Sequence, residues 1–250
     1  MTDLAYLADM PSAYVRSFRA RVTALPPGGV VLDRTYFYPS GGGQPSDRGT
    51  LRPVTGTPLE VTDVTKSGPG VLHRLARAGR PPALPVGAEV EGQIDWARRY
   101  QHMRLHTAQH LLSARAFARF GLRTRRASMA GAGGTIDLES AWPALERVGA
   151  LEDDLNDLFA RSLEVRIALV PRAQWEGAAA GRSGLVPLAP HVDPVRVIEI
   201  DGVDRCPCGG THVRSTAEVG RVRLSDPVPI PEGASRIPFT LTGDGAIPSA

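Results

Sequence analysis

Hydrophobic and polar positions follow a strand-like pattern in the first third of the chain. Between residues 14 and 93, short stretches rich in β-branched and aromatic residues are separated by clusters of Gly and Pro, such as PPGG and SGPG. Strands at this spacing are typical of a barrel or a sandwich. The pattern predicts an N-terminal β domain over residues 1–93, with RPPALPVG (80–87) as a stiff connection near its end.

Residues 96–120 follow a helical pattern instead. The segment contains neither Gly nor Pro, and apolar residues recur every three or four positions from Met103 to Phe120. Asp95 is a suitable N-cap, and Gly121 can end the helix in a left-handed conformation. We therefore expect one long helix over this segment.

The rest of the chain alternates between helical and strand-like segments. A second helix is predicted at 143–162, opened by Pro143, and a short one at 172–180. The predicted strands are 164–170, 194–200, 220–226 and 236–241. Helices interleaved with antiparallel strands give an α+β domain over residues 94–243. The last residues, 244–250, are expected to form a disordered tail.

Composition limits the class of protein. With 42% hydrophobic and 22% charged residues, the chain of 250 residues can bury a core. No apolar run reaches the roughly 20 residues that a membrane helix requires. The start, MTDLAYLADM, has an acid and no basic region before an apolar stretch, which argues against a secretory signal. We expect a cytoplasmic protein that contacts no membrane.

Arginine supplies almost all of the positive charge. The formal net charge is +3, and Lys66 is the only lysine among 29 basic residues, which leaves 28 arginines. Arginine binds phosphate in a planar fork and stacks on bases, so a nucleic-acid partner is one interpretation. A general bias towards Arg, Ala, Gly and Pro is the other, and the 27 Gly and 22 Pro favour it.

The chain has two cysteines, Cys206 and Cys208, separated by one residue. A disulfide between them would be strained and would connect no distant segments. Metal ligation, a reactive thiol and inert packing remain as interpretations.

Histidines and one cysteine have the spacing of a metal site. Positions four apart on a helix share one face, so His106 and His110 could bind one ion, although His102 and His106 have the same spacing. Downstream, the glycines of CGGTH allow a turn that brings Cys208 and His212 together. Three imidazoles and one thiolate form a tetrahedral zinc set, of either structural or catalytic type. The helix lacks the Glu of a His-Glu-x-x-His protease, which argues against peptide hydrolysis.

Several ordered motifs carry a resemblance to a known family. They are YPSGGGQPSDRG (38–49), HTAQHLL (106–112), GTIDLES (134–140), CPCGGTHV (206–213) and GASRIPF (233–239). With them the chain, from about residue 30 to 241, resembles the editing domain of alanyl-tRNA synthetase and the free-standing AlaX proteins, in their medium-length form with a glycine-rich motif.

The resemblance implies a fold and an activity. The fold would be an N-terminal β-barrel followed by an α+β zinc-binding editing domain, with one Zn²⁺ held by His106, His110, Cys208 and His212. The activity would be hydrolysis of the ester that joins Ser or Gly to tRNA(Ala). Because 250 residues leave no room for a synthetase, we expect trans-editing of released tRNA(Ala), without ATP, by a monomer or weak dimer.

Candidate catalytic residues lie beside the predicted ligands. Thr211 would hydrogen-bond a ligand or the substrate, or else stabilise the turn; Gln109 would support the ligands or have a structural role. The zinc would activate water or anchor the substrate.

Candidate substrate contacts come from three groups of residues. The glycine-rich motif either approaches the substrate or forms a turn of the barrel, and its candidates are Gly41, Gly42, Gly43, Gln44 and Asp47. The candidates for contacts that discriminate between amino acids are Arg125, Arg126 and Ser128. The candidate phosphate ligands, of which we expect some to be merely solvated, are Arg98, Arg99, Arg104, Arg123, Arg125 and Arg126.

Two other functions fit the motifs. An editor of another misacylated tRNA, such as a threonyl-tRNA editor, shares the His-rich and Cys-x-x-x-His signature. A tRNA-binding module with a purely structural zinc fits the same ligand set. The glycine-rich motif and CGGTH favour the alanine system.

Overall fold

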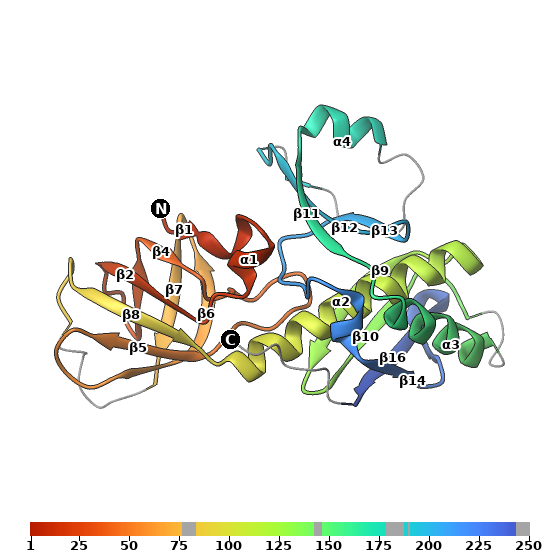
Figure 1. Cartoon of the computed structure of the whole chain (residues 1–250), viewed down its shortest axis with the longest axis horizontal. Coiled ribbons are helices and arrows are strands. Elements are labelled where there is room, and N and C mark those ends of the chain that lie inside the picture. Colours follow the sequence, from red (N-terminus) through yellow and green to blue (C-terminus); the bar gives the residue numbers. More distant parts are fainter. Residues whose placement is uncertain (77–83, 143–146, 179–187, 190, 244–250) are drawn as a thin grey trace. The chain divides into compact units, whose positions relative to one another are not determined.

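A computed structural model describes residues 1–76, 84–142, 147–178, 188–189 and 191–243. The chain divides into two compact units, 1–102 and 103–250, and the division falls within the helix α2 (Trp96–Phe120). Figure 1 shows the elements of both units. Among the described helices, none combines the length and apolar character needed to cross a membrane.

Six antiparallel strands of the first unit close into a barrel. Its strand order is β2-β3-β7-β6-β5-β8 (Figure 1). The strands are β2 (Ser17–Ala24), β3 (Gly29–Leu32), β5 (Gly49–Pro53), β6 (Leu59–Ser67), β7 (Gly70–Leu75) and β8 (Glu89–Ile94). Phe18, Ala20 and Val22 alternate with exposed residues along β2, as a strand with one buried face requires.

A buried histidine lies in the core of the barrel. His73 on β7 is 0% exposed and packs edge-on against the Phe37 ring. The Val30 carbonyl can only accept, so His73 donates from Nδ1 to that oxygen (3.3 Å) and accepts at Nε2 from the Thr35 hydroxyl (2.8 Å). Burial lowers the pKa of His73 to about 4, so this side chain is neutral in the fold.

Short elements complete the first unit. The strands β1 (Asp3–Leu4) and β4 (Arg34–Thr35) pair in parallel. A 3₁₀ turn, η1 (Ala5–Leu7), precedes the helix α1 (Met10–Ala13), whose N-cap Asp9 accepts a hydrogen bond from the Ser12 amide (2.8 Å).

The second unit contains a five-stranded sheet and a helix that packs beside it. The sheet runs in the order β14-β16-β10-β9, and β15 also pairs with β16, all antiparallel. The strands are β9 (Thr124–Ala130), β10 (Gly133–Leu138), β14 (Arg221–Leu224), β15 (Val228–Ile230) and β16 (Ala234–Thr242). The helix α3 (Arg147–Ala160) packs on β14, and its Asn156 exchanges two hydrogen bonds with the Val222 backbone.

A smaller antiparallel sheet ends with β13, the strand directly before the predicted ligand Cys208. Its order is β11 (Val165–Val170), β12 (Val195–Ile200) and β13 (Asp204–Pro207), and α4 (Arg172–Ala178) follows β11. Trp175 of α4 packs with Val170 and Val195 in a small buried cluster. Two further 3₁₀ turns are η2 (Thr216–Val219) and η3 (Pro231–Gly233).

The structure confirms the mixed α+β class and several predicted elements. The long helix covers the predicted span; Asp95 accepts from the Arg98 amide (3.1 Å), and Gly121 follows with φ +69°. The second helix is described only over α3, and Pro143 and the tail 244–250 lie outside the described residues. So do residues 179–180 of the short helix and residues 80–83 of the connection 80–87. The sequence did not predict β13, a strand of four residues.

Candidate metal centre

The helix α2 places two imidazoles on one buried face. His106 and His110 are one helical turn apart and 3% and 7% exposed. Their ring centroids are 5.1 Å apart. A spacing of four residues turns about 400° along a helix, so both rings point the same way. The helix is buried from Met103 to Leu112, which excludes water from this part of the chain.

The segment after β13 supplies a thiolate and a third imidazole. Cys208 Sγ lies 3.5 Å from Nε2 of His106 and 3.4 Å from Nε2 of His212, and the Gly210 amide donates to the same sulfur (3.3 Å). One donor atom from each of His106, His110, Cys208 and His212 lies within 4.8 Å of the others. The structure therefore brings together all four predicted ligands in a group that could hold a metal ion.

Hydrogen bonds outside the group orient two of the rings. His110 donates from Nδ1 to Asp204 Oδ2 (3.0 Å), and both side chains are under a tenth exposed. Nδ1 of His212 lies 3.2 Å from the hydroxyl of Thr107, which also accepts from the Val213 amide (3.3 Å). With Nδ1 engaged, each ring has Nε2 free for a metal, an arrangement typical of histidine ligands.

The charges of the group favour an anionic sulfur. Burial opposes ionisation of Cys208, but the charges of His106 and His212 hold the pKa of its thiol well below its ordinary value. Burial also opposes protonation of His110, yet hydrogen bonds to Asp204 and Cys208 raise its pKa to about 10. Burial, together with the charge of His106, lowers the pKa of His212. Thiolate and neutral imidazole are the forms that bind zinc, so His110 would have to release a proton when an ion binds.

Sequence reasoning missed Asp204 and Thr107 as parts of this group. Thr107 lies between the two helical histidines in the sequence. Its contact with His212, 105 residues away, forms only when the chain folds. Asp204 is four residues before Cys208, on the unpredicted β13, and is 94 residues from its partner His110. An acid shortly before the cysteine was the signal available in the sequence.

Gln109 and Thr211 lie in the same region with different surroundings. Gln109 donates from Nε2 to the hydroxyl of Ser113 (2.9 Å), which also accepts from Thr124 at the start of β9 (2.8 Å). This chain of hydrogen bonds links α2 to β9 and supports the structural role for Gln109. Thr211 is 0% exposed, inside the CGGTH turn.

The candidate substrate residues Arg125, Arg126 and Ser128 are exposed on β9. This strand pairs only with β10 among the described strands and so forms one edge of the five-stranded sheet. Arg125 is engaged in an exposed ion pair with Glu232 (2.7 Å).

The glycine-rich motif forms a closed loop in the first unit. Its ends are joined because Asp47 accepts from the Tyr38 amide (2.7 Å) and the Asp47 amide donates to the Tyr38 carbonyl (3.0 Å). At the tip, Gly41 and Gln44 exchange backbone hydrogen bonds of 3.1 and 2.9 Å. Gly42 and Gly43 have φ of +57° and +84°, which explains why glycine occupies both positions.

A buried ion pair fixes this loop to the start of α2. Arg99 and Asp47 are both 0% exposed, and Arg99 Nε lies 3.0 and 2.9 Å from the two carboxylate oxygens. Arg99 also donates to the carbonyls of Ala13 and Tyr36. These contacts favour a role for Asp47 in holding the loop.

Two of the predicted phosphate ligands are used inside the fold instead. Arg99 is fully buried, and Arg104, 7% exposed, donates to the carbonyls of Val219 and Gly243. Because their guanidinium groups are covered, the prediction that they bind phosphate is wrong. The sequence could not show this, since exposed and buried arginines carry the same local signals.

Two family models match parts of the chain. Residues 12–98 match the model described as tRNA synthetases class II (A). Residues 195–237, which include Cys208 and His212, match the threonyl and alanyl tRNA synthetase second additional domain.

Curated relatives cover nearly the whole chain. It is 33% identical to the alanyl-tRNA editing protein AlaX-M of Saccharolobus solfataricus, over 96% of this chain and 99% of the relative. The AlaX-M protein of Methanosarcina barkeri is 34% identical, over 90% of this chain and 92% of its own length. An alanine–tRNA ligase of Pyrobaculum neutrophilum is 36% identical over 95% of this chain, but the match spans only 28% of the ligase.

Proposed function

Because the chain belongs to the AlaX family of free-standing alanyl-tRNA editing proteins, we propose that it is a hydrolase that removes wrong amino acids from tRNA(Ala). The chief substrate is Ser-tRNA(Ala), and Gly-tRNA(Ala) is a second one. The observation that carries the proposal is the group of three imidazoles and one thiolate in a chain that matches AlaX-M over nearly its full length.

The donor set fits zinc, one ion per chain. Three imidazoles and a thiolate are ligands that Zn²⁺ prefers, and the lowered pKa of Cys208 favours the thiolate form. His106, His110, Cys208 and His212 would hold the ion. A bound zinc ion polarises a carbonyl or lowers the pKa of a water, or it anchors the substrate.

The residues of the chain orient and shield this centre. Asp204 and Thr107 contact Nδ1 of His110 and His212, which orients both rings. In the reaction, water adds to the ester carbonyl, the carbon–oxygen bond to the terminal ribose breaks, and the ribose hydroxyl leaves with a proton. An aminoacyl ester is already activated, so modest catalysis is sufficient. Thr211 and Gln109 stay candidates for contacts to the ligands or the substrate.

Discrimination against alanine follows from hydrogen bonding to serine. A site built to bind the serine hydroxyl leaves polar groups without partners when alanine enters, and this penalises alanine strongly. Glycine is smaller and enters without such a bond. Arg125, Arg126 and Ser128 on β9 are the candidate residues for this discrimination.

The glycine-rich loop is proposed to approach the substrate through its backbone, and Gly41 offers a test. A Cβ at Gly41 would lie 3.7 Å from the Tyr38 hydroxyl, and Gly41 does not have positive φ, so Ala fits there. Ala at Gly42 or Gly43 would be strained in any case. Gly41→Ala should lower deacylation and leave zinc content intact; unchanged deacylation would refute the substrate role of the loop, including that of Gln44.

We propose different roles for the two domains of the chain. A β-barrel domain over 1–93 would carry the glycine-rich loop, and an α+β editing domain over 94–243 would carry zinc and the catalytic residues. Support comes from the closed barrel of the first unit and from the location of all four donor residues in the second.

One experiment separates this function from its alternatives. The purified protein is analysed for zinc and then mixed with seryl-, glycyl- and alanyl-tRNA(Ala) and with seryl-tRNA(Thr). Turnover of the first two alone supports an alanine-system editor. Turnover of seryl-tRNA(Thr) alone indicates an editor of the threonyl type, which the second family model also covers. Tight tRNA binding without any turnover indicates a binding module with a structural zinc.

A further inference from the structure

The five-stranded sheet of the second unit has one buried face and one open face. Alternate residues of a strand point to opposite faces. Ile136, Ile237 and Phe239 lie side by side on the buried face and are at most 1% exposed. The alternate positions form what we call the open face, and its members are Arg126, Ser128, Ala130, Gly133, Thr135, Asp137, Arg221, Arg223, Val228, Ile230, Ala234, Arg236, Pro238, Thr240 and Thr242.

The open face is far more basic than the chain as a whole. It carries four arginines and one acid, whereas the whole chain has 29 basic and 26 acidic residues. That acid, Asp137, already binds Arg236 through two hydrogen bonds of 2.7 and 2.9 Å. In the part of the chain that the structure describes, Arg126, Arg221 and Arg223 form no ion pair. Their positive charges are therefore available to a partner.

The charges act on one another across the strands. The register places Asp137 directly between Arg126 on β9 and Arg236 on β16. The hydrogen bond from Arg236, followed by the charges of Arg236 and Arg126, lowers the pKa of Asp137 in spite of its partial burial. The Asp137 carboxylate thus stays ionised, and Arg126, Asp137 and Arg236 together keep a net positive charge.

The arginines occupy two ends of the open face, with small side chains between them. Arg126 and Arg236 are two strands apart, about 10 Å, and Arg221 and Arg223 are about 7 Å apart along β14. Arg223 is level with Thr240, four residues or about 13 Å along β16 from Arg236. The rows between the two pairs hold only Gly, Ala, Ser, Thr and Pro, so no bulky group blocks a ligand that spans them.

We propose that the open face binds the phosphodiester backbone of the tRNA. A guanidinium pairs with phosphate through two parallel hydrogen bonds, and the spaced pairs match a ligand with many phosphates better than a single anion. The large aliphatic side chains of the open face are Val228 and Ile230, both on β15 at one edge, and no member is aromatic, so the face lacks the aromatic anchor that dominates protein interfaces. The inference rests on the proposed function, because that function supplies the polyanionic partner.

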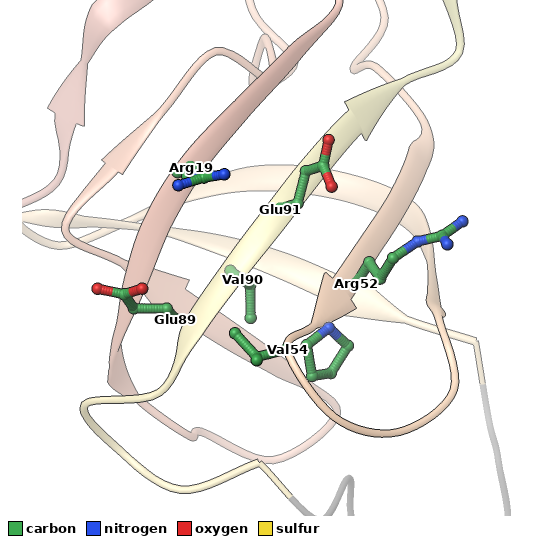
Figure 2. A pocket seen from close by; sticks show the side chains of 7 residues that line it. Arg19, Arg52, Val54, Glu89, Val90 and Glu91 are labelled. Atoms are coloured by element: carbon green, nitrogen blue, oxygen red, sulfur yellow. The ribbon is translucent and has the colours of Figure 1, made fainter.

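On a second exposed strand surface, neighbouring acids balance the charges of the arginines. On the outer wall of the barrel, a shallow pocket is lined by Arg19, Arg52, Glu89 and Glu91 among others (Figure 2). The register places Glu91 between Arg19 and Arg52, and Arg21 binds Glu89 (2.7 Å). Acid and base alternate across these strands, so this surface is a matched control.

Two double variants of the full, zinc-loaded chain test the proposal. Arg221→Gln/Arg223→Gln removes one basic pair of the open face, and Arg19→Gln/Arg52→Gln removes two exposed strand arginines of the barrel. Binding of uncharged tRNA(Ala) is measured by fluorescence anisotropy between 50 and 200 mM KCl. Each lost phosphate contact lowers the slope of log K against log salt by about 0.9. For the first variant, the loss of affinity over this fourfold salt range should be roughly tenfold smaller than for the wild type.

A substrate without a tRNA body keeps the inference and the proposed function apart. Hydrolysis of a seryl ester of adenosine should be equal in the wild type and both variants, while deacylation of Ser-tRNA(Ala) falls only in Arg221→Gln/Arg223→Gln. If the wild type hydrolyses neither substrate, the proposed function fails and the anisotropy still decides the surface. An unchanged salt slope in Arg221→Gln/Arg223→Gln, or an equal loss in the barrel variant, would overturn the inference.

Discussion

Replacement of Arg99 by Met should strongly destabilise the first unit. Met has a similar length and no charge, so the variant keeps most of the packing and removes the partner of Asp47. Both side chains of the pair are 0% exposed. The Asp47 carboxylate would be left buried without a counter-charge, and the carbonyls of Ala13 and Tyr36 would lose a donor.

The magnitude follows from the burial of the pair. Breaking a fully buried ion pair by removal of one partner lowers the free energy of unfolding by about 3–5 kcal/mol, because the remaining charge is uncompensated. For a unit of this size, a loss of about 3 kcal/mol lowers Tm by roughly 12–24 °C.

Thermal unfolding followed by tryptophan fluorescence measures the effect. Arg98→Met is the matched control, since Arg98 is adjacent in sequence and, among the described contacts, its side chain donates only to the Ser46 carbonyl (3.0 Å). If Arg99→Met does not fold, the double variant Arg99→Met/Asp47→Asn provides the comparison. It should be more stable than Arg99→Met alone, because it no longer buries an unpaired carboxylate. A Tm within about 3 °C of the wild type for Arg99→Met would refute the reasoning.

Three further predictions concern the metal centre and the barrel core. Cys208→Ala should lose zinc and deacylation, measured by metal analysis and turnover, while Cys206→Ala should keep both; the reverse result would overturn the ligand assignment. Asp204→Ala should weaken zinc binding about 10- to 100-fold in a chelator competition, whereas Asp201→Asn, whose side chain is 67% exposed, should leave it unchanged. Burial lowers the pKa of His73 to about 4, so as pH falls the imidazole takes up a proton in the unfolded chain before it does so in the folded chain. About 3 kcal/mol of the free energy of unfolding should therefore be lost between pH 6.5 and pH 4. His73→Gln should show a flatter pH profile in urea unfolding.

Local signals in the sequence determined the elements that depend on neighbouring residues. The span of α2 follows from apolar periodicity between a capping Asp95 and a left-handed Gly121, and both end signals act within one turn. The pairing of His106 with His110 follows from the pitch of a helix, and that of Cys208 with His212 from the glycine turn between them. Each half of the metal centre was therefore predictable.

Tertiary structure alone decided the contacts between residues far apart in the chain. Asp47 and Arg99 are 52 residues apart, and Asp204 and His110 are 94 apart; no periodicity or spacing links either pair. The same limit applies to the arginines, because burial separates Arg99 from Arg126 and depends on which strands and helices pack together. Sheet order likewise placed Arg126, Arg221, Arg223 and Arg236 on one face, although they come from three strands at distant positions in the sequence. Local chemistry set the elements and the ligands, and long-range packing set which charges were buried, paired or left to face a partner.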